Sequence, residues 1–314
     1  MIIESLIYLC LFVGVIKLSE FIATVYKLIK QHYFRKAQDH YKKYAIGEKN
    51  TWIAITGGSD GIGLAFCHHL AKSGFNICII GRSESKIQEK LVEIKKTNPS
   101  IQTDYVIADL GKLANYNDYE KIANQLKNKD IGMVFLNAGW GDPRRFDELQ
   151  NTVLEEMVNL DALHLLHLTK ALLPQLLSRP QKSAIVYTSS SLGLVLAPGN
   201  LTYSCAKRFT SYLSRGLAVE LKDKLDFLSF EPFGVASNLV KTKPTRTINT
   251  AEFATECALR DLGQEDGTFG SLSHYLQYYF VMYGLTTSKR MKFMYHFYTK
   301  QFHKKYSGEP EAKK

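Results

Sequence analysis

Cysteine is scarce in this 314-residue sequence, and its five cysteines are scattered along the chain, at positions 10, 67, 78, 205 and 257. They form no CxxC pair and show no spacing typical of a metal site. We therefore expect free thiols in a reducing compartment and no bound metal. The sequence also lacks internal repeats and long low-complexity segments, which excludes a repeat architecture.

Acidic residues are outnumbered, because 30 Asp and Glu stand against 40 Lys and Arg and give a net charge of +10. The basic residues cluster near the two ends, in Lys27–Lys43 and Lys289–Lys305, beside aromatic and aliphatic side chains. That arrangement favours an anionic membrane surface over a nucleic-acid groove. We expect no nucleic acid among the partners.

Long apolar runs are lacking except near the N-terminus. The uncharged run Leu6–Ile16 is shorter than the ~20 residues that a bilayer requires. Extended to Ile29, it could span the membrane or lie in its interface. Basic residues follow this run and do not precede it, which argues against a cleaved signal peptide and places the globular part on the cytosolic side. The alternative is an amphipathic helix packed on its own domain or on a partner subunit.

The segment Thr51–Gly63 is a short apolar run that ends abruptly in glycines. It predicts a buried parallel strand, a tight turn and the start of a helix over Ile62–Ser73. Gly57, Gly61 and Gly63 would permit positive φ and let a pyrophosphate approach the backbone at the helix N-terminus. A glycine-rich turn that only lets helix and strand pack is the alternative.

A second buried strand, Asn76–Ile80, runs into Gly81, Arg82 and Ser83. An acidic residue near this point would bind the ribose 2′-hydroxyl of NAD, whereas arginine accommodates a 2′-phosphate. No acid stands here, so the sequence favours NADPH over NADH. Arg82 could instead be an ordinary solvated charge at the start of a helix.

Strand and helix patterns alternate without hairpin signals in the next hundred residues, which is typical of an α/β, doubly wound parallel sheet of the Rossmann type. Ligands bind beyond the carboxyl ends of such strands, where Asp109 and Asn137–Gly139 fall. The expected elements are helices over 84–97, 116–128 and 151–177, strands over 103–108 and from Gly132, and a central strand over 183–191 that runs into hydroxyls at its carboxyl end. The two histidines of the last helix, His164 and His167, are expected to be packing or surface residues.

Hydroxyl and amine side chains gather at and beyond the carboxyl end of the expected strand over 183–191. Ser189, Ser190 and Ser191 stand at its carboxyl end, and Tyr203 and Lys207 share one face of the following helix. A nearby cation favours phenolate and lowers the pKa of a phenol, so this pair could transfer a proton near neutral pH.

These motifs resemble the short-chain dehydrogenase/reductase family over residues 50–240, and most closely its membrane-bound branch of very-long-chain 3-oxoacyl-CoA reductases and 17β-hydroxysteroid dehydrogenases of type 3 and type 12. The motifs are Thr56–Gly63, Asn137–Gly139, Asn159, Ser190, Tyr203 with Lys207, and Pro232. Two departures are Leu136, where the family has a first Asn, and Ser237, where Thr is usual. Both substitutions loosen cofactor contacts without removing a catalytic group.

The resemblance implies roles for the residues that match. Tyr203 would donate the proton, Lys207 would hold the nicotinamide ribose and acidify Tyr203, Ser190 would bind the substrate carbonyl, and Asn159 would support a proton-relay water. The implied cofactor-binding residues are Gly57, Ser59, Asp60, Gly61, Ile62, Gly63, Arg82, Ser83, Asp109, Leu110, Asn137, Ala138, Gly139, Tyr203, Lys207, Pro232, Val235 and Ser237.

The implied function is NADPH-dependent reduction of a lipid ketone at the cytosolic face of the endoplasmic reticulum, by a homodimer or a larger membrane assembly. Leu192–Pro198, Phe209, Tyr212 and Phe233 would line an apolar pocket, or else belong to the core. We expect three parts: an anchoring or docking helix with a basic linker (1–45), the nucleotide-binding domain (46–272) and a basic aromatic extension (273–314) that touches the membrane or a protein. The alternative is an accessory subunit of a membrane complex, for example in the mitochondrial inner membrane, that keeps the fold without turnover.

Overall fold

The computed structural model describes residues 2–47, 50–237 and 242–306, with side chains described up to residue 300. The chain divides into two compact units, Met1–Gln38 and Asp39–Lys314. The division falls inside the predicted N-terminal part, and the three predicted boundaries stay predictions.

The N-terminal unit is one helix, α1 (Ile2–Ile29), which continues into a π-helical turn, η1 (Lys30–Phe34). No side chain of α1 is buried. The helix Ile2–Phe34 has a mean hydropathy of 2.1 in its most apolar window and is long and apolar enough to cross a membrane. Apolar residues around a whole helix are typical of a segment whose solvent is lipid.

Seven parallel strands form a single sheet in the second unit, in the order β3-β2-β1-β4-β5-β6-β7. The predicted doubly wound sheet is therefore confirmed. The strands are β1 (Thr51–Thr56), β2 (Asn76–Gly81), β3 (Thr103–Ile107), β4 (Asp130–Leu136), β5 (Ser183–Thr188), β6 (Leu225–Phe230) and β7 (Gly267–Thr268). Every residue of β1 and of β5 is buried, as expected for strands covered on both faces.

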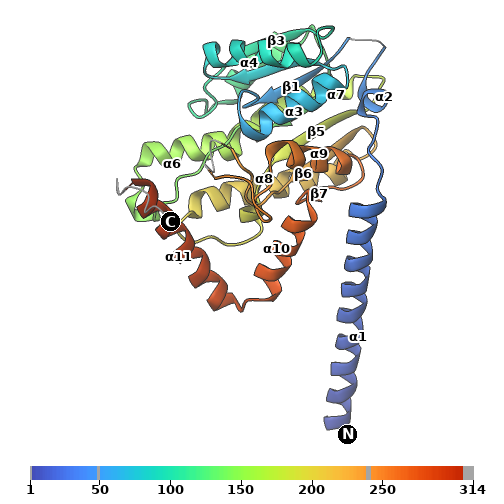
Figure 1. Ribbon diagram of the computed structural model, residues 1–314, viewed down its shortest axis with the longest axis vertical. Helices are drawn as coiled ribbons and strands as arrows, with labels where there is room; N and C mark the ends of the chain where they lie inside the picture. Colours follow the sequence, from blue (N-terminus) through green and yellow to red (C-terminus); the bar gives the residue numbers. More distant parts are fainter. Residues whose placement is uncertain (1, 48–49, 238–241, 307–314) are drawn as a thin grey trace. The chain divides into compact units, whose positions relative to one another are not determined.

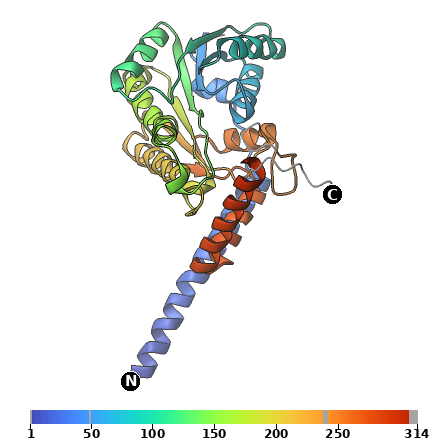
Figure 2. The ribbon, with the colours of Figure 1, turned by 90° about the vertical axis from the view of Figure 1, so that its left-hand side faces the viewer.

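Helices cover both faces of this sheet (Figures 1 and 2). One face packs against α3 (Gly61–Lys72), α4 (Glu84–Thr97) and α9 (Ala251–Asp261), and the other against α5 (Tyr116–Leu126), α7 (His164–Leu177) and α8 (Leu201–Glu220). Each layer encloses its own apolar core. The short elements between them are α2 (His40–Tyr44), η2 (Phe146–Glu148), α6 (Asn151–Val158) and η4 (Ser191–Gly193).

The predicted helix over 151–177 is interrupted by a π-helical turn, η3 (Asn159–Leu163), in which the N–H of His164 bonds to the carbonyl of Asn159. The extra residue in this turn rotates the chain relative to a regular α-helix. Residues on either side of η3 therefore do not share the face that a regular periodicity predicts.

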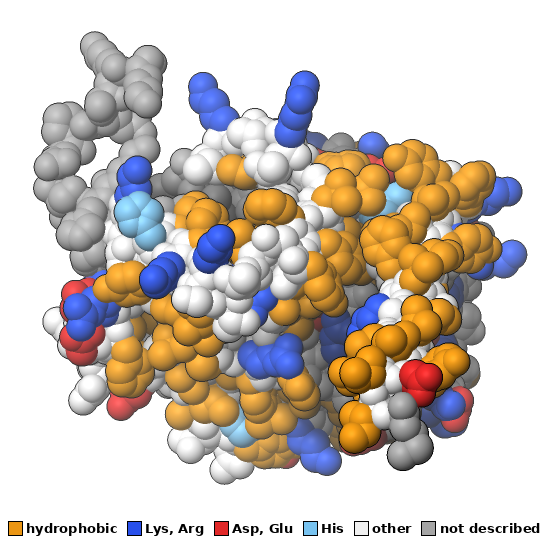
Figure 3. All heavy atoms as spheres, turned by 90° about the horizontal axis from the view of Figure 1, so that it is seen from below, with side chains coloured by type: hydrophobic (Ala, Val, Ile, Leu, Met, Phe, Trp, Pro, Cys, Tyr) orange, Lys and Arg blue, Asp and Glu red, His pale blue; other side chains and the backbone are white. Residues whose placement is uncertain are grey.

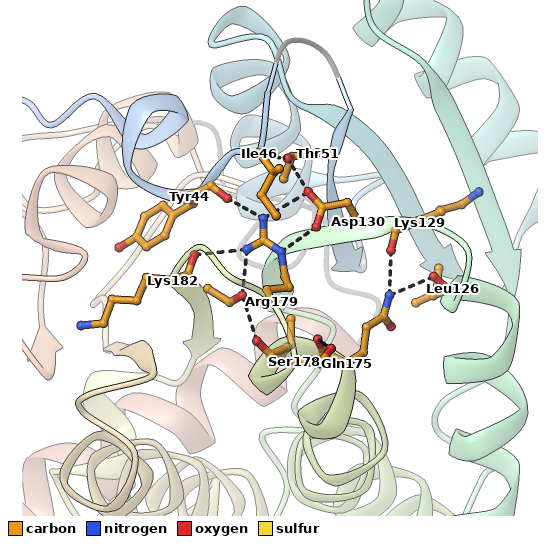
Figure 4. Close-up of polar contacts among 12 residues, drawn as sticks. Tyr44, Ile46, Thr51, Leu126, Lys129, Asp130, Gln175, Ser178, Arg179 and Lys182 are labelled. Carbon is orange, nitrogen blue, oxygen red and sulfur yellow. Dashed lines mark hydrogen bonds and ion pairs between the residues drawn. The ribbon is translucent and has the colours of Figure 1, made fainter.

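Arg179 forms hydrogen bonds that link neighbouring strands at the amino-terminal edge of the sheet (Figure 4). Its guanidinium forms a bidentate pair with Asp130, at 2.6 and 3.1 Å, and it also donates to the Tyr44 carbonyl at 2.7 Å and the Ser183 hydroxyl at 2.8 Å. Thr51 donates to the same carboxylate at 2.6 Å. The network joins β1, β4, β5 and α2 at the edge opposite the expected ligand site.

The C-terminal segment forms a helical hairpin of α10 (Leu272–Tyr283) and α11 (Thr287–Tyr306). Met294 of α11 and Tyr278 of α10 pack with Val195 and Ala197, which follow β5. The hairpin thus covers the segment 192–198 at the carboxyl end of the sheet.

Candidate functional site

The glycine turn after β1 has the geometry that a bound pyrophosphate requires. Gly57 and Gly61 have φ values of 67° and 46°, which favour glycine. A Cβ atom on Gly63 would lie 2.3 Å from the Gly57 carbonyl oxygen, so only glycine fits there. The first N–H groups of α3 have no partner within the helix and carry its positive dipole end. These residues fit a dinucleotide.

The turn after β4 is tied to the end of β1. The hydroxyl of Thr56 accepts hydrogen bonds from the backbone N–H groups of Asn137 and Ala138, at 2.9 and 3.0 Å. Asn137 also donates its side-chain amide to the Thr56 carbonyl at 3.3 Å. These hydrogen bonds therefore join the two turns expected to bind the cofactor, at the carboxyl edge of the sheet.

The remaining predicted cofactor residues lie on the loops that follow the strands. Arg82 and Ser83 are exposed after β2, where their side chains can meet a phosphate. Leu110 is buried, and Asp109 beside it pairs loosely with Lys112 at 3.6 Å. After β6, the Pro232 carbonyl accepts from the Ser191 N–H at 3.1 Å.

Five further predicted positions lie beside the glycine turn or in the loop after β6. Val235 is buried, and the Cβ atom of Ser237 lies 3.0 Å from the Cβ that Gly61 would carry. Ser59 and Ile62 are half-buried beside the glycine turn, and Asp60 pairs with Lys86 at 2.7 Å.

Tyr203, Lys207 and Ser190 converge at the carboxyl end of β5. Tyr203 and Lys207 lie one helical turn apart near the start of α8, with the ammonium nitrogen 5.5 Å from the phenol ring centroid. The Ser190 side chain acts to lower the pKa of the nearby Tyr203 phenol, and its hydroxyl oxygen accepts a hydrogen bond from the Leu192 N–H at 3.2 Å. The convergence expected from sequence is present in the structure.

A carboxylate that sequence analysis missed, Asp161, completes this cluster. Asp161 lies in η3, and its Oδ1 is 3.0 Å from the Nζ of Lys207, with side-chain exposures of 0% and 3%. Lys207 also donates to the Thr188 carbonyl at 2.9 Å. A Cβ atom on Gly139 would lie 2.4 Å from the Asp161 carboxylate, which shows how closely the loop after β4 covers the pair.

The electrostatics of the cluster differ from the sequence expectation. Burial raises the pKa of Tyr203 above 10; the Lys207 cation counteracts this effect and the Asp161 anion adds to it. Burial alone would lower the pKa of Lys207, but the Asp161 carboxylate raises it overall. The predicted lowering of the phenol pKa is therefore not found, because burial outweighs the effect of the lysine and the buried Asp161 anion acts in the same direction as burial.

The side chain of Asn159, predicted to support a proton-relay water, has its hydrogen-bond partner outside the Tyr203–Lys207 cluster. Its side-chain amide donates to the Gly111 carbonyl at 3.0 Å, and the contacts of Lys207 are made by Asp161 and Thr188. The cause is the π-helical turn, which begins at Asn159 and brings the residue two positions later to the site. A signal existed in the sequence, since Asp161 interrupts the apolar stripe that runs from Met157 to Leu165.

The apolar wall expected beside the site is only partly as predicted. Val195 and Ala197 are buried under the C-terminal hairpin, and Tyr298 of α11 lies within electrostatic range of Tyr203. Phe209 and Tyr212 are instead exposed on α8. The hairpin, which the sequence suggested only as a surface for a membrane or partner, thus contributes to the wall of the site.

The sequence profile described as short chain dehydrogenase matches residues 51–247 of this chain. The very-long-chain 3-oxoacyl-CoA reductase of Macaca fascicularis is 32% identical over 235 residues, covering 72% of each chain. Hydroxysteroid dehydrogenase-like protein 1 of Gallus gallus is 29% identical over 287 residues, covering 88% of this chain and 84% of its own.

Solved structures share the fold. A 7beta-hydroxysteroid dehydrogenase superposes with a TM-score of 0.73 at 21% identity, over 82% of this chain and 99% of its own. A short-chain dehydrogenase from Sphingobium yanoikuyae in complex with NADPH superposes with a TM-score of 0.60 at 22% identity, over 67% and 83%. With its profile match and its glycine turn, the chain belongs to the short-chain dehydrogenase family of oxidoreductases.

Proposed function

We propose that this protein is an NADPH-dependent, membrane-bound reductase of a lipid ketone, of the 3-oxoacyl-CoA or 17-oxosteroid type. The observation that carries the proposal is the convergence of Tyr203, Ser190 and Lys207 next to the glycine turn after β1. A scaffold would have no need of a hydroxyl, a phenol and an ammonium arranged in this way.

The assignment of NADPH as the cofactor depends on the positive charge of Arg82 at the edge of the site. Gly57, Gly61 and Gly63 would accept the pyrophosphate at the α3 N-terminus, and Arg82 would pair with the 2′-phosphate. When bound, NADPH supplies the hydride that reduces the carbonyl carbon. The loop residues Asn137–Gly139 would fix the nucleotide beside Tyr203.

The protein's own residues supply the proton and the orientation. Ser190 would donate a hydrogen bond to the ketone oxygen, and Tyr203 would transfer its phenolic proton to that oxygen as the C–O double bond becomes a single bond. The raised pKa of Tyr203 keeps this proton in place at neutral pH. Solvent then returns a proton to the phenolate, so that one ketone and one proton yield one alcohol for each hydride.

The substrate class is inferred from the pocket wall and the relatives. Val195, Ala197, Met294 and Tyr298 form an apolar wall suited to an acyl chain or a sterol. Proteins named very-long-chain 3-oxoacyl-CoA reductase are similar to this chain over most of its length. A long acyl thioester with a 3-oxo group is the first substrate to test.

Membrane association follows from α1 and, we propose, from the C-terminal hairpin. The helix Ile2–Phe34 and the similar reductases are consistent with a membrane-associated protein, and we propose the endoplasmic reticulum. Leu276, Phe280 and Tyr283 of the hairpin are 57%, 65% and 80% exposed. Apolar side chains interleave with Lys and Arg on the face seen in Figure 3. This composition suits the interface of an anionic bilayer.

The test is NADPH oxidation by the full chain in detergent or nanodiscs, with 3-oxoacyl-CoA thioesters of increasing length and with 17-oxosteroids. We expect turnover of at least one class, and a loss of about 10²-fold or more in Tyr203→Phe, which lacks the phenolic hydroxyl that donates the proton. If the folded protein binds NADPH tightly but turns over no ketone, the proposal fails. That outcome favours an accessory subunit that uses the exposed hairpin for docking.

A further inference from the structure

We infer that the C-terminal hairpin and the segment 192–198 enclose the binding site for the alkyl chain of the substrate, which extends from Tyr203 towards the turn between α10 and α11 at residues 284–286. The inference rests on the proposed function, because it uses Tyr203 to place the reacting carbonyl. It deepens that function by selecting a linear acyl chain over the rigid rings of a steroid.

The chain site is a small apolar cluster, separate from the two cores on either side of the sheet. Its buried members are Val195, Ala197 and Met294. A cluster with so few buried members, lying under a hairpin, opens at a lower cost than a main core. The apolar residues that pack against these three and stay partly buried are Leu192, Tyr278, Val281, Met282 and Tyr298.

One wall of the chain site is a single face of α11. Arg290, Met294 and Tyr298 follow one another at intervals of four residues and therefore share this face. From Arg290 to Tyr298 the face extends about 12 Å, because an α-helix rises about 1.5 Å per residue. A Cβ atom on Gly199 would lie 3.2 Å from the Cβ of Tyr298, so α11 packs closely on the chain just before Tyr203. The inner end of the chain site therefore lies beside the reacting carbonyl.

The opposite wall is a face of α10. Tyr278, Val281 and Met282 are spaced by three and four residues, which places them on one side of that helix. Arg290 of α11 donates to the Met282 carbonyl at 3.1 Å and so joins the two walls near the turn. The apolar path is thus continuous from the turn to Tyr298.

The outer end of the path lies at the turn, which is the part of the hairpin farthest from the sheet in Figure 1. Phe280, Tyr283 and Lys289 are exposed on either side of it. Aromatic and basic side chains together suit the interface of an anionic bilayer. A bilayer bound there would hold the tail of a long acyl chain while its carbonyl end reaches Tyr203.

The side chains that line the path favour a flexible occupant. Met282 and Met294 are unbranched and have three rotatable bonds, so they adapt to a chain that passes between the helices. Met294 packs directly with Val195 and Ala197, and an occupant must displace it. An alkyl chain requires only a narrow opening, whereas a fused ring system requires a wide, largely preformed cavity. The cluster therefore selects an acyl chain.

Photocrosslinking tests the path without turnover. The full chain in nanodiscs, with NADP⁺ bound, is irradiated with hexadecanoyl-CoA that carries a diazirine in mid-chain, and the labelled residues are identified by mass spectrometry. We expect adducts at Val281, Met282 or Met294 that an excess of 3-oxohexadecanoyl-CoA prevents. The absence of adducts from these inner faces, or adducts that the competitor does not prevent, overturns the inference.

Chain-length selectivity is the second readout. Val281→Trp should lower the ratio of kcat/KM for 3-oxohexadecanoyl-CoA to that for 3-oxooctanoyl-CoA by about tenfold, the effect of removing roughly two methylene groups from apolar contact. Val92→Trp is the matched control, because it makes the same substitution at a position of α4 that is 61% exposed. The control should leave the ratio unchanged. Equal losses for both thioesters in Val281→Trp contradict a chain site at this position.

The two proposals fail separately. If no ketone is reduced, the proposed function fails, while the crosslinking still decides whether the hairpin binds an acyl chain. If ketones are reduced but the competitor does not prevent labelling, the proposed function stands without this chain site.

Discussion

The Ser190 hydroxyl oxygen accepts a hydrogen bond from the Leu192 N–H at 3.2 Å, and in the proposed reaction this hydroxyl donates to the ketone oxygen. Ser190→Ala should lower kcat/KM for the ketone about 10²-fold, because a preorganised donor to a developing oxyanion contributes on that scale. Steady-state kinetics with the neighbouring Ser191→Ala as control checks this. Equal kinetics for Ser190→Ala and the natural protein would remove Ser190 from the mechanism.

Gly139 is the residue at which added volume would meet the ion pair directly. The Cβ atom of Gly139→Ala would lie 2.4 Å from Asp161 and 2.9 Å from Lys207. We expect a drop in activity of about tenfold or more, because misplacing a catalytic group by about 1 Å can have a 10²-fold effect. The control is Gly216→Ala in α8, where no heavy atom lies within 4 Å. Similar activities of the two variants would show that the pair tolerates displacement.

The residue scale also shows where sequence reasoning reaches its limit. The glycine turn and the Tyr203/Lys207 spacing are local patterns, so their prediction needed no knowledge of packing. The choice between Asn159 and Asp161 depends on one π-helical turn, to which the sequence points only through the interruption of the apolar stripe at Asp161. The sign of the Tyr203 pKa shift is set mainly by burial, with a smaller contribution from Asp161, and the Tyr203/Lys207 spacing shows neither, so the sequence predicted the sign wrongly.

At the scale of elements, the Arg179 network joins β1, β4 and β5 at the sheet edge opposite the site. Removing one charge from a buried pair leaves the partner uncompensated, so Asp130→Asn should lower the free energy of unfolding by about 2 to 4 kcal/mol. Lys121→Ala, which removes a surface pair with Asp118, should change it by less than about 1 kcal/mol. Denaturant unfolding in detergent compares them. An equal loss of unfolding free energy in both variants would show that burial of the Arg179–Asp130 pair contributes nothing to stability.

The C-terminal hairpin is the element we expect to respond to lipid. Residues 272–300 should exchange backbone hydrogens more slowly in nanodiscs that contain anionic lipid than in purely zwitterionic ones, because Lys289, Arg290 and Lys292 stand beside exposed aromatic residues. The helix α4 is the internal control. Identical exchange of the hairpin in both lipid compositions would contradict a membrane contact.

Elements were predictable where their pattern is local. The helix over 84–97 agrees with the structure because its buried residues Ile87, Leu91 and Ile94 repeat at helical spacing. The strands after Asn76 and Ser183 agree because each is a short, continuously buried run. β7 has two residues, too few for any periodicity. The contact of the hairpin with Val195 and Ala197 joins segments a hundred residues apart, and composition alone does not encode it.

At the scale of the whole molecule, three buried histidines make folding sensitive to acid. Burial is the main cause that lowers the pKa of His40, His164 and His274 below 6.5. The folded state therefore binds fewer protons than the unfolded state, and this contribution to stability is complete above pH 6.5 and is lost as pH falls. We expect a loss of about 1 kcal/mol per pH unit for each histidine involved, starting near pH 6.5.

Urea unfolding in detergent at pH 7.5, 6.5 and 5.5 measures this dependence. His164→Asn, which cannot take up a proton, should show a shallower slope than the natural protein. A free energy of unfolding that stays level or rises between pH 6.5 and 5.5 would contradict the prediction.

The whole account depends on hydride transfer at the carboxyl edge of the sheet. The most direct measurement incubates the full chain in nanodiscs with NADPH deuterated at nicotinamide C4, in each of the two C4 configurations, and a long-chain 3-oxoacyl-CoA, then determines the mass of the product. The account predicts a 3-hydroxyacyl-CoA with one deuterium on the former carbonyl carbon from one of the two cofactors, formed about 10²-fold or more slowly with Tyr203→Phe. Unreacted thioester after incubation with the folded, NADPH-bound protein, or a reduced product without deuterium from either cofactor, would contradict it.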